Sequence, residues 1–157
     1  MSKRVTIHLV RHAKAGSRRA WKGDDALRPL SKRGTTQARA VAKRLAGEHV
    51  TRIVSSPYVR CVETVAPLGA RIEVEVERSD ALAEGATLAD SLRLLEKCAD
   101  QHAVLCTHGD VLGNLLEHFA HQGVALGDDR LEKASSWVLD VVDGEERAAR
   151  DEPPPGS

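Results

Sequence analysis

Aromatic residues and cysteines are scarce in this sequence. Phe, Tyr and Trp make up 3% of the 157 residues, so aliphatic side chains must fill the core. The cysteines are Cys61, Cys98 and Cys106, an odd number that argues against a disulfide framework and favours buried, reduced thiols. No apolar stretch is long enough for a signal peptide or a membrane span, so we expect a cytoplasmic protein that does not bind membranes.

An excess of either charge is also missing. The sequence holds 23 basic and 23 acidic residues and no basic-aromatic motif, so we expect no nucleic-acid partner. Hydrophobic residues at 41% and charged residues at 29% are typical of a globular domain. We expect one domain over residues 1–144, because the segment 145–157 is charged and rich in proline, as disordered tails are.

The hydrophobic period switches repeatedly between strand-like and helix-like. Alternating or β-branched runs predict strands at 5–10, 52–55, 71–76, 103–107 and 136–142. Apolar residues three and four apart, together with capping signals, predict helices over 38–45, from Pro57 onward, over 88–95 and over 112–119. This alternation predicts an α/β fold with three layers, in which an open, mostly parallel sheet has helices on both faces.

Polar side chains follow the first four predicted strands, where the chain leaves the sheet. In chain order they are Arg11 with His12, then Arg60, Glu84 and His108. The carboxyl ends of parallel strands share one edge of a sheet, and ligands bind at that edge in such folds. We therefore expect these side chains to form a single site.

Several segments resemble the signature motifs of a known family. Residues 9–13 (LVRHA) resemble its Arg-His-Gly signature, and residues 55–64 (SSPYVRCVET) resemble its second signature. Residues 107–109 (THG) match its second-histidine motif, and residues 28–38 (RPLSKRGTTQA) are similar to the segment before its first helix. From these ordered motifs the chain is identified as a member of the histidine phosphatase, or phosphoglycerate-mutase-like, superfamily.

Two branches of that superfamily share features with this chain. The short length and residues 28–30 (RPL) resemble the small phosphohistidine phosphatases of the SixA type. Residues 11–17 (RHAKAGS), 21–25 (WKGDD) and 106–109 (CTHG) are similar to the phosphatase-like domain of some bacterial MutT/Nudix hydrolases. Ala13 stands where the family signature has glycine, so the backbone there must accept a Cβ.

The resemblance implies catalysis through a covalent phosphohistidine, without a metal or another cofactor. It makes His12 the nucleophile that attacks phosphorus and His108 a donor to the phosphoryl oxygens. Arg11 and Arg60 are the expected phosphate clamps, because a guanidinium stays charged and donates two parallel hydrogen bonds. Ser17 is a further candidate for phosphate binding, with the capping of a turn as its alternative role.

A general acid is needed when the leaving group is a poor one, such as an alkoxide. By resemblance Glu84 takes this role, and Asp24 or Asp25 in the long loop are alternatives. The spacing of the cysteines and His108 matches no zinc pattern, so we predict no metal site.

Three functions are compatible with these residues. The first is a phosphatase that acts on phosphohistidine in a partner protein, because a minimal domain without a large insertion leaves its site open to a protein side chain. The second is a phosphatase of small phosphoesters or nucleotides, which the basic loop at 14–33 and Trp21 favour. The third is a domain that binds phosphorylated ligands without catalysis, although such a domain has no need of His12.

Overall fold

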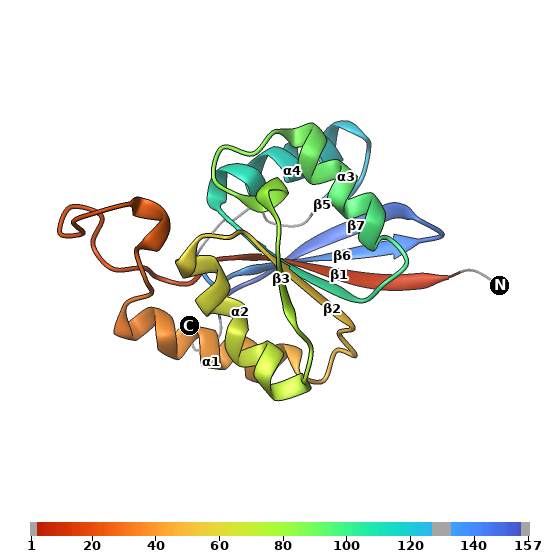
Figure 1. Ribbon diagram of the computed structural model, residues 1–157. Coiled ribbons are helices and arrows are strands. Elements are labelled where there is room, and N and C mark those ends of the chain that lie inside the picture. The colour runs from red at the N-terminus through yellow and green to blue at the C-terminus, as the bar shows by residue number, and fades with distance from the viewer. Residues whose placement is uncertain (1–2, 127–132, 155–157) are drawn as a thin grey trace.

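A mixed β-sheet lies between two layers of helices (Figure 1). The computed structural model describes residues 3–126 and 133–154. Within these residues the sheet has seven strands in the order β3-β2-β4-β1-β6-β7-β5. In chain order the strands are β1 (Arg4–Arg11), β2 (Arg52–Ser55), β3 (Val76–Arg78), β4 (Ala103–Thr107), β5 (Ala125–Leu126), β6 (Ser136–Val142) and β7 (Glu145–Glu152).

Helices cover both faces of the sheet (Figure 1). One face carries α1 (Lys32–Leu45) and α2 (Val59–Ile72), and the other carries α3 (Leu88–Cys98) and α4 (Gly109–His121). Two short 3-10 turns, η1 (Asp25–Leu27) and η2 (Asp80–Leu82), precede α1 and α3. None of the helices in the described ranges is long and apolar enough to cross a membrane.

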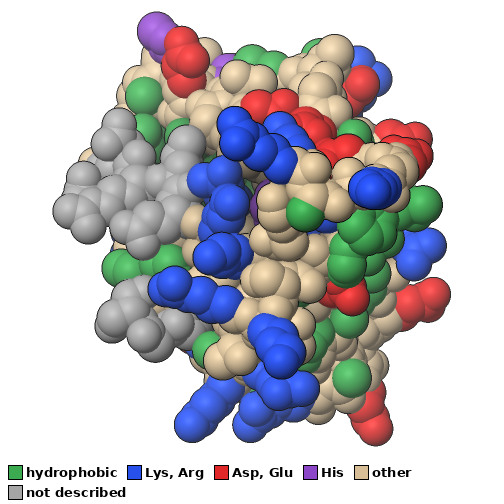
Figure 2. All heavy atoms as spheres, turned by 90° about the vertical axis from the view of Figure 1, so that its left-hand side faces the viewer, with side chains coloured by type: hydrophobic (Ala, Val, Ile, Leu, Met, Phe, Trp, Pro, Cys, Tyr) green, Lys and Arg blue, Asp and Glu red, His purple; other side chains and the backbone are tan. Residues whose placement is uncertain are grey.

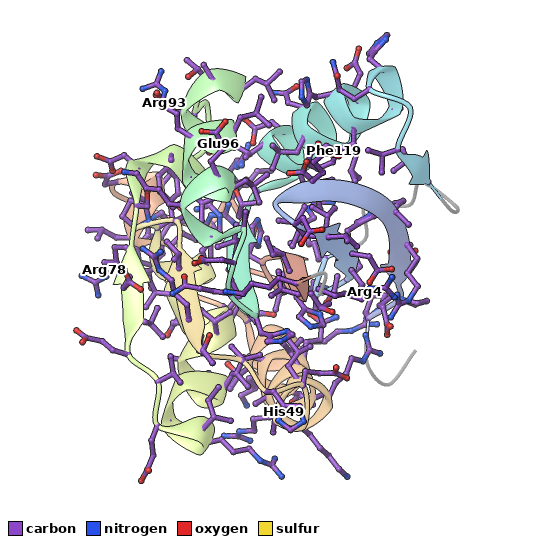
Figure 3. All side chains as sticks on the ribbon, turned by 90° about the vertical axis from the view of Figure 1, so that its right-hand side faces the viewer. Arg4, His49, Arg78, Arg93, Glu96 and Phe119 are labelled. Carbon is purple, nitrogen blue, oxygen red and sulfur yellow. The ribbon has the colours of Figure 1, made fainter. Side chains whose placement is uncertain are left out.

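The helices turn apolar stripes toward the sheet. Phe119 of α4 points toward the sheet and is 2% exposed, whereas Arg93 of α3 points away from it (Figure 3). The stripe predicted on α1 is buried, and its residues are Ala38, Val41, Ala42 and Leu45. Two hydrophobic cores result, one under each helical layer.

The parallel part of the sheet determines where the candidate site lies. β3, β2, β4 and β1 run parallel to one another, and β6 is antiparallel to β1. All five residues of β4 are buried, as expected for a central strand that is covered on both faces. The predicted three-layer α/β fold is confirmed, and the carboxyl ends of β1, β2 and β4 lie at one edge.

The prediction of a disordered tail is wrong for Glu145–Glu152. These residues form β7, which pairs antiparallel with β6 and extends the sheet beyond the predicted boundary at 144. Asp143 and Gly144 make the connecting turn with φ values of 51° and 81°, and a two-residue hairpin of this kind requires positive φ. The charged composition concealed this strand, because charged side chains are tolerated in a hairpin near the edge of a sheet. Residues 155–157 of the predicted tail lie outside the described residues.

The strand predicted over 71–76 is also wrong in its position. α2 continues through Ile72 and ends at Glu73, whose φ of 59° lies in the left-handed region. β3 therefore begins only at Val76. The first residues of the predicted strand belong to the last turn of α2. Apolar residues also recur at short intervals in a helix, so this part of the pattern resembled a strand.

The loop between β1 and α1 is anchored where it meets the helix. Ala15 forms an isolated β-bridge with Leu30, and the Ser31 hydroxyl donates to the Lys14 carbonyl (3.0 Å). The Ser31 hydroxyl also accepts from the Gly34 amide (3.1 Å) and so caps α1. Gly34 packs directly on the Lys14 carbonyl, where a Cβ has no room. These contacts hold the start of the loop beside His12.

Candidate active site

The side chains predicted to form a site do meet in one pocket. The pocket has a volume of about 380 Å³ and lies at the carboxyl edge of the parallel strands. Its lining residues are Arg11, His12, Arg18, Arg28, Arg60, Glu84, His108, Gly109, Asp110 and Lys133. Figure 2 shows Lys and Arg side chains gathered in a band down this face of the molecule. Because cations outnumber carboxylates in the lining, the pocket favours an anionic ligand.

His12 is held as a neutral ring with a defined proton position. Its amide donates to the Thr107 carbonyl of β4 (3.0 Å). Its Nδ1 lies 2.7 Å from the Ala13 carbonyl oxygen, which can only accept, so Nδ1 carries the proton and Nε2 keeps its lone pair. Burial lowers the pKa of His12 from 6.5 to about 3, helped by nearby positive charges and opposed by the Ala13 hydrogen bond. The ring is therefore uncharged at neutral pH.

Thr64 connects the His12 loop to α2. Its Oγ1 accepts from the Ala13 amide (2.9 Å) and donates to the Arg60 carbonyl (2.7 Å). Both Ala13 and Thr64 are fully buried, so each of these bonds satisfies a group that water cannot reach. The Cβ of Ala13 is accommodated in the core between α1 and α2. Thr64 thus links the positions of His12 and Arg60.

Arg60 enters the pocket from the first turn of α2 and is 1% exposed. Its guanidinium donates to the Asp25 carbonyl (2.8 Å), to the Asp25 carboxylate (3.0 Å) and to Glu84 (3.3 Å). The Tyr58 ring lies 4.8 Å from its Cζ, in the range of a cation–π contact. These groups hold a buried cation at the pocket and partly neutralise it.

Arg11 lies across the first turn of α4. A Cβ on Gly109 would come within 3.1 Å of the Arg11 Cζ, so the glycine makes room for the guanidinium. Burial lowers the pKa of Arg11, yet a guanidinium remains charged in proteins. Gly109 and Asp110 bring the N-terminus of α4, with its free amides and positive dipole end, to the same pocket.

His108 lies beside His12, with 5.4 Å between the ring centroids. Its Nε2 is 2.9 Å from the Ser56 hydroxyl and 3.5 Å from the Cys61 sulfur. The Tyr58 ring meets it edge-on at 4.7 Å. The Ser56 side chain therefore contacts His108 instead of capping a helix that starts at Pro57. The helix predicted from Pro57 begins two residues later, at Val59.

Ser17 lies outside the pocket that holds His12. Its hydroxyl accepts from the Ala20 amide (3.3 Å) and its carbonyl accepts from the Trp21 amide (3.1 Å), which are the contacts of a turn. Ser17 instead lines a neighbouring hollow of about 490 Å³. Its phosphate-binding role stays a prediction.

Some lining residues were not predicted as site residues. They are Arg18, Arg28, Gly109, Asp110 and Lys133. Arg18 and Arg28 belong to the basic loop at 14–33, whose positive charge is visible in the sequence. Asp110 directly follows the second-histidine motif. Lys133 gave no signal, because it lies outside every motif and reaches the pocket only through the folding of a distant segment.

A metal centre has no support from the side chains that the structure describes. Among those residues, no group of three or more His, Cys, Asp or Glu is placed to hold a metal ion. Cys61, Cys98 and Cys106 are buried as free thiols. Burial raises the pKa of Cys98 and of Cys106, which keeps these two thiols protonated.

Sequence comparison connects the chain to known proteins. Residues 7–89 match the model of the histidine phosphatase superfamily (branch 1). An 8-oxo-(d)GTP phosphatase of Mycolicibacterium smegmatis is 36% identical over 146 residues, which cover 89% of this chain and 45% of the relative. An uncharacterized protein of Mycobacterium tuberculosis is 38% identical over 65 residues, which cover 41% of this chain and 32% of the relative. The chain thus spans less than half the length of these curated relatives.

Solved structures share the fold. The protein histidine phosphatase SixA, in complex with tungstate, matches with a TM-score of 0.74 at 15% identity over 96% of both chains. A mycobacterial glucosyl-3-phosphoglycerate phosphatase matches with a TM-score of 0.67 at 20% identity over 100% of both chains. With the family model matching residues 7–89 and the fold agreeing along the chain, this protein belongs to the histidine phosphatase superfamily.

Proposed function

We propose that the chain is a phosphatase that forms a covalent phosphohistidine on His12. The observation that carries this proposal is the neutral His12 ring, whose Nδ1 is bound to the Ala13 carbonyl in a pocket lined by Arg11 and Arg60. Its Nε2 has the lone pair that a nucleophile needs. The arginines hold the negative charge of the phosphoryl oxygens during in-line attack, so the reaction needs no metal.

The reaction consists of two displacements. In the first, the Nε2 lone pair of His12 forms a bond to phosphorus while the bond from phosphorus to the leaving group breaks. In the second, water attacks phosphorus, the P–N bond breaks, its electron pair returns to Nε2, and inorganic phosphate leaves. One difficult displacement by water is replaced by two easier ones.

Glu84 is the proposed proton donor for a poor leaving group, and it takes the proton back from the attacking water. Glu84 lines the pocket and its side chain is 40% exposed, so solvent reaches its carboxyl group. Asp25 is less suited to the role. Burial alone raises its pKa, but the hydrogen bond from Arg28 and the charge of Arg60 outweigh burial, so the pKa of Asp25 is lowered and its carboxyl stays ionised. Asp24 instead caps η1.

His108 is the proposed donor to the phosphoryl oxygens. The Ser56 oxygen already accepts from the Tyr58 amide, so its hydroxyl hydrogen is available to the Nε2 of His108. With Nε2 accepting from Ser56, the tautomer proposed for His108 carries its hydrogen on Nδ1, which has no hydrogen-bond partner in the described part of the chain. This N–H, on a ring that lies 5.4 Å from the His12 ring between centroids, is the proposed donor to a bound phosphoryl group.

A phosphohistidine in a partner protein is the first candidate substrate. The fold matches that of the protein histidine phosphatase SixA with a TM-score of 0.74. Imidazole is also a good leaving group, so the reaction does not depend on a strong general acid.

A nucleotide is the second candidate substrate. The relative that is 36% identical over 89% of this chain is named an 8-oxo-(d)GTP phosphatase. The excess of cations around the pocket suits a ligand with several negative charges.

Hydrolysis of an aryl phosphate in the presence of a chelator tests the mechanism. We expect the wild type to turn over and to form an acid-labile phosphoenzyme, and we expect His12→Ala to abolish both, with a loss of at least roughly a thousandfold. His121→Ala is the matched control, because this histidine is 76% exposed on α4. Unchanged activity in His12→Ala would exclude His12 as the nucleophile.

The same assay separates the two candidate substrates. The kcat/KM for a phosphohistidine protein is compared with that for nucleoside di- and triphosphates, with each rate tested for its dependence on His12. A large preference for the phosphoprotein supports the first candidate, and a large preference for the nucleotides excludes it.

A further inference from the structure

A basic hollow adjoins the pocket that holds His12. It has a volume of about 490 Å³. Its lining residues are Lys14, Ala15, Gly16, Ser17, Arg18, Arg28, Ser31 and Lys133. Three of these residues, Arg18, Arg28 and Lys133, also line the His12 pocket, so the two spaces share a boundary. The band of Lys and Arg in Figure 2 covers the same face.

The basic hollow is built around a buried arginine. The Arg28 side chain is 8% exposed, with its Nε bound to Asp25 (3.0 Å) and one terminal nitrogen bound to the Gly16 carbonyl (2.6 Å). These two contacts fix the guanidinium in place. A guanidinium has five N–H donors, so donors remain for a ligand.

The charge of the basic hollow is of one sign. Its charged lining residues are Lys14, Arg18, Arg28 and Lys133, and no acidic residue of the described ranges lines it. Burial and the positive charges of Arg11, Arg28, Lys14 and Arg18 lower the pKa of Lys133, which is what repulsion among crowded cations produces. An anion in the hollow relieves this repulsion.

We propose that the basic hollow binds a second phosphoryl group of the substrate, attached directly to the one that His12 attacks. This inference rests on the proposed function and names its substrate class, a compound with adjacent phosphoryl groups such as a nucleoside di- or triphosphate. Because Arg18, Arg28 and Lys133 face both spaces, an anion in the hollow lies next to the reacting phosphoryl group. A lone phosphohistidine has no second phosphoryl group to place there, so the hollow favours the nucleotide candidate.

Calorimetric binding of two non-reacting anions tests the inference without relying on turnover. The probes are inorganic phosphate and methylene diphosphonate, which differ in the second phosphoryl group. Lys14 lines the hollow but not the His12 pocket, and its side chain is exposed, so Lys14→Gln removes a charge from the hollow and no side chain from the lining of the His12 pocket. Lys32→Gln is the control, because it removes an exposed charge from the same segment outside the hollow.

We expect the wild type to bind the diphosphonate more tightly than phosphate. Lys14→Gln should weaken diphosphonate binding about fivefold, the upper range for one exposed charge pair, and leave phosphate binding unchanged. Lys32→Gln should alter neither. Equal affinity of the wild type for both anions, or equal weakening of both by Lys14→Gln, would overturn the inference. Phosphate binding that persists while the aryl phosphatase assay fails would instead count against the proposed function.

Discussion

His12 combines a buried ring with a proton held on Nδ1, and each feature depends on a different neighbour. The Ala13 carbonyl fixes the proton, and the surrounding core excludes water from a ring that is 7% exposed. The ring is thus kept as a free base at neutral pH. The same burial connects the chemistry of His12 to the stability of the fold.

The pH dependence of unfolding should show this connection. The pKa of His12 is about 3 in the folded protein and about 6.5 in the unfolded chain, so the unfolded chain alone binds a proton between these values. The stability is complete above pH 6.5 and is lost as the pH falls toward 3. In urea unfolding, the wild type should lose about 1.4 kcal/mol per pH unit more than His12→Gln between pH 6 and pH 4.

The comparison with His12→Gln isolates this one group. His8 is also buried with a lowered pKa, but it contributes equally in both proteins. Parallel stability curves for the two proteins would show that His12 titrates at its ordinary pKa. The kcat/KM profile gives a second readout, since no acid limb from His12 should appear above pH 5.

Single residues were predictable where a motif carried them and not elsewhere. His12, Arg60 and His108 stand in motifs at strand ends, and they do meet in the pocket. Thr64 lies inside the second motif, but its link between Ala13 and Arg60 is a contact between segments that no local pattern describes. Lys133 also reaches the pocket from a distant segment, which no local pattern describes.

At the scale of elements, the junction between the His12 loop and α1 depends on close backbone approach. Gly34, in the first turn of α1, packs on the Lys14 carbonyl, and a Cβ there would clash with backbone that cannot easily move. We expect Gly34→Ala to destabilise the fold by about 1–3 kcal/mol, the usual cost of overpacking. The free energy of unfolding in urea measures this effect.

Gly47→Ala is the matched control for that variant. Gly47 follows α1, and nothing lies within 4 Å of a Cβ added there. The control should change the stability by no more than about 0.5 kcal/mol. Equal stability of Gly34→Ala and Gly47→Ala would show that α1 shifts freely relative to Lys14.

Elements with strong periodicity were predictable, and the hairpin at the C-terminal end was not. The strands at 52–55, 103–107 and 136–142 form with the predicted bounds, because burial on both faces leaves apolar, β-branched runs. β7 is charged along much of its length, so composition indicated a tail. The Asp143–Gly144 turn was the available signal, since Asp-Gly between two extended segments favours a two-residue hairpin.

At the scale of the whole molecule, an anion bound at the site should stabilise the fold. Five cationic side chains line the pocket, among them the buried Arg28 and Arg60, and repulsion between them weakens the folded state. A ligand that binds only the folded state stabilises it by mass action, by about 2.7 kcal/mol at a hundred times its dissociation constant. Saturating inorganic phosphate should therefore raise the Tm by roughly 5–10 °C in a domain of this size.

The increment in Tm, rather than the Tm itself, tests whether that stabilisation comes from the site. Arg60→Gln should have a lower Tm of its own, because Asp25 and Glu84 each lose one of their cationic partners. Its increment with phosphate should fall to that produced by sodium chloride at equal ionic strength. His121→Ala, on the outer face of α4, should keep the full increment. If Arg60→Gln gained as much from phosphate as the wild type, phosphate would be binding elsewhere on the basic face, and the Arg60 clamp would have to be abandoned.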